Sequence, residues 1–408
     1  MTRPLAALSL ALLAGTAAAG SSQGTAAPQA GSTGATKPAR QKPTSAAPGA
    51  SAAAFDDLAA RAKKAHAEQR LDEAADLYQR ALKLRPDWTE GRFALGTVLY
   101  DLDRYEEARA AFRRVTSERP KSGPAWALKG VCEFKLKELE TALADLQKGL
   151  LLGLGDNAEL QSVANYHAAI LLTRFGQPEA AWDILRGFAL RDYDSPTIIE
   201  ALGLSTLRLP YLPSEAPVEK REMIIMTGRA VYQLVKNRRA EATRTAFQEL
   251  VARFPEEPNV RYAYGVFLLR DEAQAALAEL RRVLEMQPSH LPALLQIVSQ
   301  LIKEGDFKGA LAYAEKAVAT APDQTASRTA LGRVLVELGE MDRAIQELEE
   351  AVRLAPQNDQ AYFALSRAYQ RAGREKDARK ALAVFVELDK ARRARDAPAP
   401  EHTQQESP

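Results

Sequence analysis

One pattern of small and apolar residues recurs along the chain, and it limits the folds open to this sequence more than any other feature. Thirty-four residues separate Pro86 from Pro120, and the same number separates Pro322 from Pro356. A unit of this length cannot bury its own apolar face, so neighbouring units must stack on one another. The pattern therefore predicts an all-α solenoid of antiparallel helix pairs. Two copies with identical internal spacing are Leu95, Gly96, Leu99, Ala108, Phe112, Pro120 and Leu331, Gly332, Leu335, Ala344, Leu348, Pro356.

The small residues and prolines of the pattern have definite structural roles. Gly96 and Gly332 are predicted to lie where the first helix of a pair contacts the second, because a larger side chain would hold the helices apart. Gly305 and Gly339 are predicted to form turns between paired helices, since glycine readily adopts left-handed backbone angles. Proline disfavours helix in the residue before it, so prolines mark the ends of second helices. These prolines are Pro86, Pro120, Pro322 and Pro356.

The repeated residues resemble the tetratricopeptide-repeat family, whose units of about 34 residues carry Leu-Gly, Tyr, Ala, an aromatic residue and Pro in this order. The resemblance extends over residues 55–390. It implies a superhelical solenoid that binds protein partners, needs no cofactor and catalyses no reaction. Because one fold serves many functions, protein binding is here a family expectation.

Repeats and composition together divide the chain into segments. The stretches outside the repeats are rich in small and polar residues that cannot bury a core, so disorder is expected there. The predicted segments are a signal peptide (1–19), a disordered linker (20–54), an N-terminal repeat array (55–194), an irregular helical repeat with a proline-rich insertion (195–255), a C-terminal repeat array (256–391) and a disordered tail (392–408).

The middle segment departs from the regular pattern. Pro210, Pro213 and Pro217 fall within eight residues and exclude a continuous helix there. One interpretation is a hinge between two separate arrays. The other is a decorated repeat inside one continuous superhelix, and the sequence leaves both open.

The first residues have the features of a bacterial secretory signal. Arg3 supplies a positive charge, Leu5 to Leu13 form a short apolar run, and Ala17 to Ala19 offer small residues for cleavage. The run is shorter than the roughly 20 apolar residues that cross a bilayer, and no later stretch is long and apolar enough to do so. We therefore predict cleavage near Ala19 and a periplasmic or secreted mature protein without a transmembrane segment.

Charge and reactive residues argue against several other functions. The chain has 55 basic and 53 acidic residues, a balance that excludes a general affinity for nucleic acid. Cys132 is the only cysteine, and four scattered histidines do not provide the ligand cluster of a metal centre. Cys132 is predicted to be an inert thiol and His167 a buried structural histidine. The chain is predicted not to be an enzyme, and no catalytic, cofactor-binding or metal-binding residue is assigned.

In this family, one side of each first helix lines a concave groove. Aromatic residues and arginine are frequent anchors of interfaces, and arginine holds carboxylates by paired hydrogen bonds. A basic C-terminal groove therefore favours an acidic partner segment. The alternative is that the arginines pair only with neighbouring acids such as Glu337. The residues predicted to line the groove are Phe93, Tyr100, Phe134, Tyr262, Arg333, Phe363, Arg367 and Arg371.

One variant of the family clamps the C-terminal carboxylate of chaperones with Lys and Asn on its first helices. The residues at those positions of the C-terminal array are Leu295, Ser299, Ala330, Gln360 and Ala364, so this function is not expected here. The leading hypothesis is a scaffold that holds an extended or helical segment of an envelope protein. The alternatives are an accessory or targeting subunit of an envelope enzyme complex, and a structural protein that forms homo-oligomers.

Overall fold

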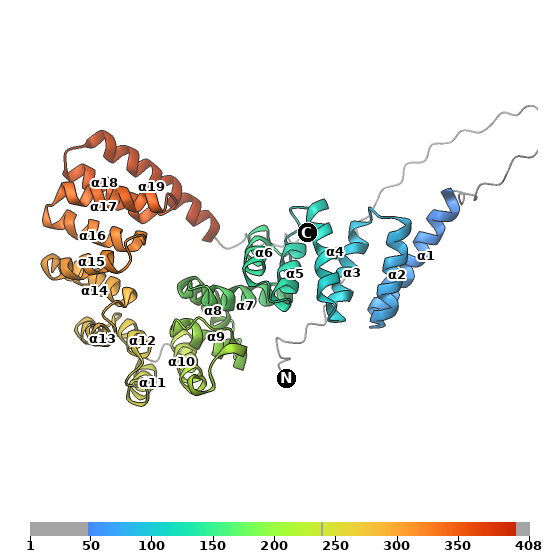
Figure 1. Cartoon of the computed structure of the whole chain (residues 1–408), viewed down its shortest axis with the longest axis horizontal. Helices are drawn as coiled ribbons and strands as arrows, with labels where there is room; N and C mark the ends of the chain where they lie inside the picture. The colour runs from blue at the N-terminus through green and yellow to red at the C-terminus, as the bar shows by residue number, and fades with distance from the viewer. Residues whose placement is uncertain (1–47, 238–239, 397–408) are drawn as a thin grey trace, which may run out of the picture. The chain divides into compact units, whose positions relative to one another are not determined.

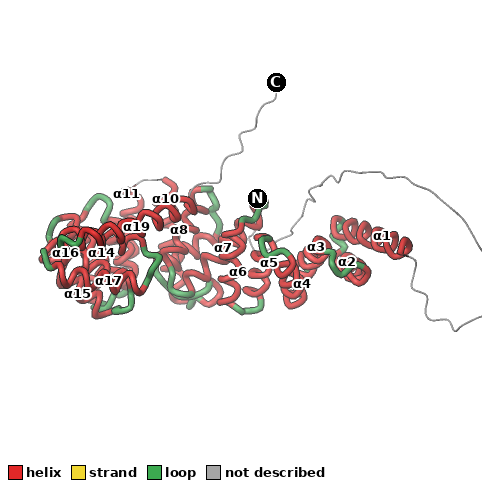
Figure 2. Tube along the Cα trace, turned by 90° about the horizontal axis from the view of Figure 1, so that it is seen from above, coloured by secondary structure: helices red, strands yellow, loops and turns green. Residues whose placement is uncertain are grey.

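The computed structural model describes residues 48–237 and 240–396. In this part of the chain it contains 19 α-helices, one short 3-10 helix and no β-strand (Figures 1 and 2). Consecutive helices pack as antiparallel pairs, so the predicted all-α repeat fold is confirmed. The predicted signal peptide lies outside the described residues.

Internal contacts divide the described chain into two compact units. Unit 1 runs to Ala201 and also includes Leu209–Ala216, and unit 2 comprises Leu202–Arg208 and the chain from Pro217 onward. The division falls in the segment that breaks the repeat pattern, and α9 (Pro196–Thr206) spans it. The other helices of unit 1 are α1 (Pro48–Ala67), α2 (Leu71–Leu84), α3 (Thr89–Asp101), α4 (Tyr105–Glu118), α5 (Gly123–Lys135), α6 (Leu139–Leu152), α7 (Ala158–Arg174), α8 (Pro178–Leu190) and the 3-10 helix η1 (Pro213–Glu215).

Unit 2 contains the regular C-terminal repeats, and Figure 1 shows α12 to α19 stacked in chain order. The core of these repeats is a continuous apolar cluster to which every helix from α12 to α19 contributes. The helices of unit 2 are α10 (Val218–Asn237), α11 (Ala240–Arg253), α12 (Pro258–Leu268), α13 (Ala273–Met286), α14 (Leu291–Glu304), α15 (Phe307–Thr320), α16 (Thr325–Leu338), α17 (Met341–Leu354), α18 (Asp359–Arg371) and α19 (Glu375–Asp396).

Glycine brings the two helices of a pair into close contact, as the sequence predicts. A Cβ atom on Gly332 would lie 2.4 Å from Cγ of Leu348, and one on Gly96 would lie 2.8 Å from the ring of Phe112. Both contacted side chains are completely buried. A side chain at either glycine would therefore push the second helix of the pair outward.

The turns between paired helices adopt left-handed backbone angles. Gly305 and Gly339 have φ angles of 79° and 85°, which confirms the predicted turns. In unit 1 the same conformation is adopted by Gln69, Asp103 and Lys137, with φ of 58°, 58° and 66°. Because these residues are not glycines, their three turns are not recognisable from composition, unlike the α7–α8 turn, where Gly176 has φ of 73°.

The predicted boundaries of the disordered ends need correction. Helix α1 begins at Pro48, inside the segment expected to be a disordered linker through residue 54. Alanine dominates this stretch and is the strongest helix former, and proline is tolerated at a helix start. Helix α19 continues to Asp396, past the predicted end of the array at residue 391. There, Arg392 pairs with Asp359 of α18 at 3.0 Å and holds the extension against the preceding helix.

Candidate functional site

The first helices of neighbouring repeats contact one another in both units. In unit 2, α14 contacts α16 and α16 contacts α18, and in unit 1, α5 contacts both α3 and α7. Residues at equivalent positions of these inner helices therefore share one surface, which is where the sequence places the binding groove.

A hollow of about 240 Å³ opens on this surface in unit 2. Apolar side chains of α14 form one wall, and small residues of α16 leave the space open. This volume is below the roughly 300–1,000 Å³ typical of small-molecule sites, so it suits a side chain better than a complete cofactor. The lining residues are Leu295, Val298, Ser299 and Ile302 of α14, Ala326, Thr329, Ala330 and Arg333 of α16, and Asn358 and Gln360 at the start of α18.

Arg333 is the one predicted groove residue that lines this hollow. Its side chain is exposed and makes no hydrogen bond or ion pair with any described residue. Lys303, at the end of α14, is also exposed and also lacks a partner among the described residues. The hollow therefore adjoins positive charge that the protein itself does not neutralise.

The other two predicted arginines are bound within the protein. Arg367 and Arg371 of α18 both donate to Glu337 of α16, at 3.0 and 2.9 Å. Arg371 also donates to the carbonyl oxygen of Val336 at 2.8 Å. For these two residues the structure shows the internal pairing that the sequence left as an alternative.

The predicted aromatic residues serve internal packing to different degrees. Tyr100 and Tyr262 are each only 9% exposed, and the ring of Tyr262 lies 5.0 Å from that of His290. Phe134 is half-buried, with its ring 4.7 Å from His167. Phe93 packs its ring 5.6 Å from Phe112. The sequence pattern cannot separate groove positions from packing positions, because large side chains suit both.

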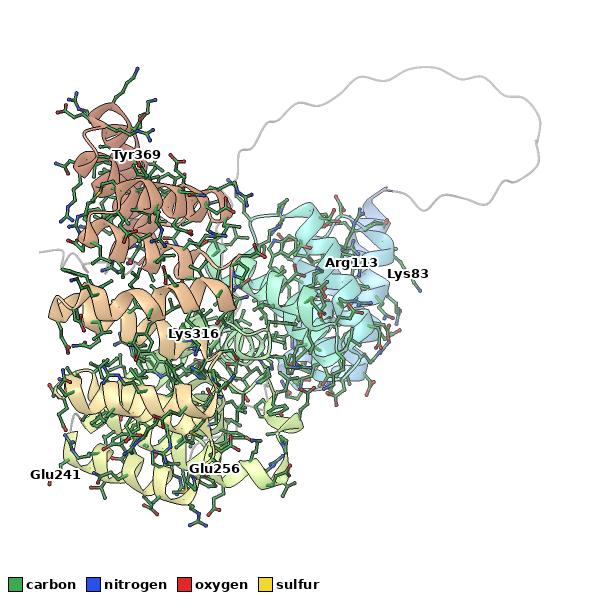
Figure 3. The ribbon with its side chains drawn as sticks, turned by 60° about the vertical axis from the view of Figure 1, so that its left-hand side comes forward. Lys83, Arg113, Glu241, Glu256, Lys316 and Tyr369 are labelled. Carbon is green, nitrogen blue, oxygen red and sulfur yellow. The ribbon has the colours of Figure 1, made fainter. Side chains whose placement is uncertain are left out.

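At the last inner helix, Phe363 is 45% exposed and contacts Phe385 at 5.1 Å. It is the most accessible of the predicted aromatic residues. Tyr369, on another face of the same helix, is labelled in Figure 3. Its hydroxyl donates to Glu349 of α17 at 2.6 Å, and burial together with this bond raises its pKa to about 12. The face of α18 that carries Tyr369 is therefore committed to the fold.

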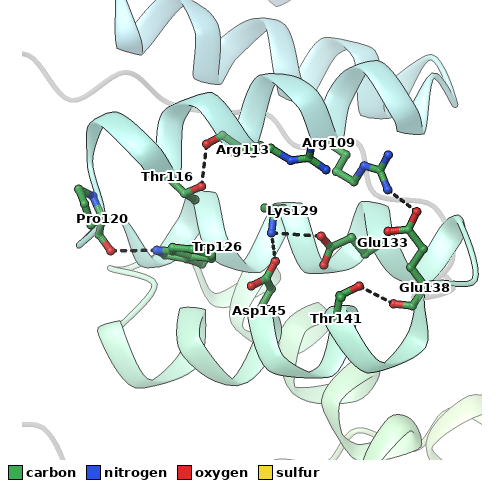
Figure 4. Close-up of polar contacts among 10 residues, drawn as sticks. All are labelled: Arg109, Arg113, Thr116, Pro120, Trp126, Lys129, Glu133, Glu138, Thr141 and Asp145. Atoms are coloured by element: carbon green, nitrogen blue, oxygen red, sulfur yellow. Dashed lines mark hydrogen bonds and ion pairs between the residues drawn. The ribbon is translucent and has the colours of Figure 1, made fainter.

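A buried ionic cluster lies between α5 and α6 of unit 1 (Figure 4). Lys129 pairs with Glu133 of its own helix at 3.1 Å and donates to Asp145 of α6. One carboxylate oxygen of Glu133 is buried without a hydrogen-bond partner. Burial, and then the negative charge of Asp145, raises the pKa of Glu133 to about 7. The cluster connects the two helices of one repeat, and none of its three side chains is more than 14% exposed.

The histidine and cysteine singled out in the sequence are structural. Nδ1 of His167 lies 2.8 Å from the carbonyl oxygen of Val163, and burial lowers the pKa of this imidazole to about 4. Cys132 is fully buried, and burial raises the pKa of its thiol to about 12. A thiol with this pKa forms little of the reactive thiolate.

Neither a metal-binding cluster nor a helix suited to crossing a membrane is found among the described residues. No group of His, Cys, Asp and Glu side chains there is arranged to hold a metal ion. None of the helices in this part of the chain combines the length and the apolar composition that a membrane crossing needs.

Lys303 is a part of the site that was not among the residues predicted from the sequence. Lys303 and Glu337 occupy the same position in successive units, and so do Arg333 and Arg367. This equivalence predicts that Arg367 forms an ion pair with Glu337. It also predicts that Arg333 has Lys303, a residue of the same charge, as its neighbour. The difference between Arg333 and Arg367 can therefore be predicted from the sequence, but only when residues of adjacent repeats are considered together.

Stacked helix pairs with a shared inner surface define an α-solenoid of the helical-repeat class. Family models for the tetratricopeptide repeat match residues 65–132, 229–290, 301–353 and 339–395, which together cover more than half of the chain. The chain belongs to the tetratricopeptide-repeat family, whose members are typically non-enzymatic scaffolds.

Comparison with individual proteins adds little to the family assignment. No curated protein matches the sequence. Among solved structures, MamA from Desulfovibrio magneticus RS-1 is 22% identical, with 42% of this chain and 96% of that chain covered and a TM-score of 0.38. The anaphase-promoting-complex hetero-tetramer Cut9–Hcn1 is 17% identical, with 82% and 66% covered and a TM-score of 0.35. At these TM-scores the likeness has no bearing on function.

Proposed function

We propose that this protein is a non-catalytic scaffold that binds a segment of a partner protein on the inner helices of unit 2. The observation that carries the proposal is the hollow between α14 and α16, bordered by the unpaired Arg333. Interfaces typically use an apolar pocket together with an arginine as anchor. Both are present here on the surface where this family places its binding groove.

The chemistry of the rest of the chain supports a role without catalysis. Cys132, Glu133 and His167 have strongly shifted pKa values, but each is buried in the packing of unit 1. A catalytic acid, base or nucleophile must reach its substrate as well as have a suitable pKa. None of these groups lines the hollow of unit 2.

We further propose that the scaffold works in the bacterial envelope, in the periplasm or as a secreted protein. The support is the sequence alone, in the charged start, short apolar run and small residues of 1–19. Intact-mass measurement of the protein recovered from the cells that produce it tests this. A mature chain that begins at Gly20 in the extracytoplasmic fraction supports export, and a full-length chain in the cytoplasm contradicts it.

Affinity capture tests the scaffold function itself. Immobilised full chain is exposed to envelope extract beside Arg333→Glu and Arg281→Glu variants, and retained proteins are identified by mass spectrometry. Arg281 is exposed on the outer helix α13 and has no partner among the described residues, so it matches the charge change at Arg333 outside the groove. We expect a partner retained by the wild type and Arg281→Glu but lost by Arg333→Glu. A chain that retains no protein in any form is not a scaffold of this kind. An enzyme among the captured proteins would make the chain an accessory subunit.

The outer face of α19 favours self-association as a second candidate function. Ala344 and Leu348 of α17 are completely buried, where the following helix α18 packs on α17. Leu382 occupies the position of Leu348 in the last repeat and is 44% exposed, and Val386 is 50% exposed. Exposed apolar residues at the end of an array commonly need a cover, because terminal repeats otherwise carry a polar face.

The first helix shows what such a polar face looks like. Asp57, Arg61 and Lys64 of α1 are exposed at positions that hold Ser327, Leu331 and Val334 in α16. In an assembly of two copies, the two α19 helices would therefore pack against each other, and α1 would not cover α19. An interface that uses the same surface on both copies gives a closed dimer. Sedimentation at increasing concentration tests this with Leu382→Glu as the variant. A dimer lost in the variant supports it, and a monomer at all concentrations excludes it.

A further inference from the structure

The charge beside the hollow of unit 2 differs from that one repeat further on. Arg367 is neutralised because Glu337 precedes it on the neighbouring inner helix, 3.0 Å away. The residue that stands in the same relation to Arg333 is Lys303, a second cation. Glu337 lies one turn beyond Arg333 on α16, but Arg367 and Arg371 already occupy it. Arg333 and Lys303 thus form an uncompensated basic pair at adjacent inner helices.

The residues that line the hollow, called the channel below, extend along both α14 and α16. Its α14 residues run from Leu295 to Ile302, and its α16 residues run from Ala326 to Arg333. The seven helical steps between these residues extend about 10 Å, which equals the length of about three residues in extended conformation. The channel therefore matches a tripeptide stretch of an extended chain.

The walls of the channel divide it into an apolar part and a polar rim. Leu295, Val298 and Ile302 supply the apolar wall, and Ala326 and Ala330 leave room opposite it. An aliphatic side chain that enters here loses contact with water, at about 25 cal/mol per Å² of apolar surface. Ser299 and Gln360 on the rim make no hydrogen bond with a described residue, so both remain available to the backbone of a bound segment.

We propose that this channel binds an internal, extended segment of a partner protein, in which an aliphatic side chain enters the hollow and an adjacent pair of acidic side chains contacts Arg333 and Lys303. The inference rests on the proposed scaffold function and specifies its ligand. A carboxylate supplies the charge that both cations lack, and an Arg–carboxylate pair is among the stronger polar contacts available to a surface.

The segment is internal rather than a chain terminus because the clamp positions of this channel carry no positive charge to hold a terminal carboxylate. At the positions where clamp-type repeats present Lys, Asn and Arg, this array has Leu295, Ser299, Ala330, Gln360 and Ala364, none of which is charged. The positive charge lies at Arg333 instead, near the end of the channel. Side-chain carboxylates reach such a position on flexible stems without requiring the partner chain to end there.

Fluorescence anisotropy with synthetic probes tests the proposal on the full chain. The probe is a fluorescein-labelled, C-terminally amidated decapeptide of Gly and Ser with a central Leu-Asp-Glu. One control probe replaces Asp-Glu by Lys-Lys, a second replaces Leu by Ser, and a third carries a free C-terminal carboxylate after Leu but no acidic side chain. The protein variants are Arg333→Glu, Ala330→Leu, which fills the channel, and Arg281→Glu as the matched control.

We expect saturable binding of the Leu-Asp-Glu probe that weakens at least tenfold in Arg333→Glu and in Ala330→Leu but not in Arg281→Glu. The Lys-Lys and Ser probes should bind at least tenfold more weakly, and salt should weaken the wild-type complex. Circular dichroism checks that each variant keeps its helical content. If Ala330→Leu does not fold, the proposal is tested by Arg333→Glu alone, because this change is at an exposed site.

Three results overturn the inference. They are no saturable binding up to about 1 mM probe, equal binding of the Lys-Lys probe, and tight binding of the terminal-carboxylate probe alone. The scaffold function is judged separately by affinity capture. A partner retained equally by the wild type, Arg333→Glu and Ala330→Leu leaves the chain a scaffold but assigns its site elsewhere.

Discussion

The charges of a few buried side chains in unit 1 depend on the pH. Glu133 is 3% exposed and has a carboxylate oxygen without a hydrogen-bond partner, whereas Asp145 is 9% exposed and accepts a bond from Lys129. Burial and the nearby Asp145 carboxylate therefore favour the protonated form of Glu133. With that proton in place, Lys129 and Asp145 form a balanced ion pair in a buried setting.

The raised pKa of Glu133 predicts that unit 1 loses stability as the pH rises. Folded protein keeps a proton at this carboxyl up to a pKa of about 7, while the unfolded chain releases it near its ordinary value of 4.5. The stabilising contribution is complete below the unfolded value and is lost as the pH passes through the folded one. We expect the free energy of unfolding to fall by on the order of 1–3 kcal/mol between about pH 5 and about pH 8.

Urea unfolding followed by tryptophan fluorescence measures this effect. Glu133→Gln should remove most of the pH-dependent loss, and Glu140→Gln, an exposed acid on α6, should leave it unchanged. An equal pH slope in the wild type and Glu133→Gln would show that another group titrates.

Glycine gives a second residue-scale prediction. A Cβ on Gly203 would lie 1.9 Å from the carbonyl oxygen of Ile224, a backbone atom that cannot rotate away. Gly203→Ala should therefore cost about 2–3 kcal/mol of unfolding free energy, as overpacking does. Gly187 lies inside α8, and its nearest atom would be Nη2 of Arg191 at 3.9 Å. Gly187→Ala should instead stabilise by about 0.5–1 kcal/mol through helix propensity. Chemical denaturation of both variants measures these changes in unfolding free energy. An unchanged unfolding free energy in Gly203→Ala would contradict the close contact.

Among the residues around the candidate site, those at the contacts between paired helices were best predicted from the sequence. The repeat pattern placed Gly332 at the contact between paired helices, because close packing leaves only small residues at such a point, and the structure shows Leu348 as its contact. The state of Arg333 was not predicted, because it depends on which side chain the adjacent repeat places beside it.

At the scale of elements, α11 packs on α10 and α12, and aromatic stacking adds to its contact with α12. The ring of Phe247 lies 6.0 Å from Tyr264 and 5.5 Å from Phe267, with interplanar angles of 21° and 29°. Phe247 is only 2% exposed. Arg244 adds an ion pair with Glu272 on the same side.

Removal of this ring should loosen α11 selectively. Phe247→Ala should cost about 3–5 kcal/mol, the usual loss for a buried phenylalanine. Amide hydrogen exchange should accelerate over 241–253 and remain unchanged in α16 to α18. Phe385→Ala in α19 is the matched control and should leave exchange in α11 at its wild-type rate. Uniform acceleration across unit 2 in Phe247→Ala would contradict an element held locally.

The elements at the two ends were predicted less well than those in the arrays. Helix α1 begins within an Ala, Gly and Ser stretch, and α19 continues into an Arg-rich stretch. Both extensions lie outside the repeat register, so the periodicity gave no information about them. The ion pair from Arg392 to Asp359 that fixes α19 joins residues 33 positions apart.

At the scale of the whole molecule, the two units have separate cores and should unfold separately. Helical repeats contact mainly their neighbours, so stability is local along the chain. All three tryptophans, Trp88, Trp126 and Trp182, lie in unit 1. Tryptophan fluorescence therefore reports unit 1, and circular dichroism reports both.

We expect the two signals to give different urea midpoints. Leu146→Ala, in the core of unit 1, should shift the fluorescence midpoint, and Leu348→Ala, in the core of unit 2, should shift only the circular dichroism curve. Each change should cost about 2–5 kcal/mol in its own unit. Coincident curves that both variants shift together would show a single cooperative transition.

The sequence by itself determined the fold class, the helix pairs and the turns that contain glycine. These depend on short-range periodicity and on steric limits at single positions, which neighbouring residues in the chain fully specify. Only the tertiary structure decided which predicted groove residues are accessible. Tyr100 and Tyr262 are buried, Arg367 and Arg371 are neutralised by Glu337, and Arg333 remains unpaired at the edge of a hollow. Accessibility and ion pairing arise between repeats, so they follow from how adjacent helices bring distant side chains together and not from the pattern within one unit.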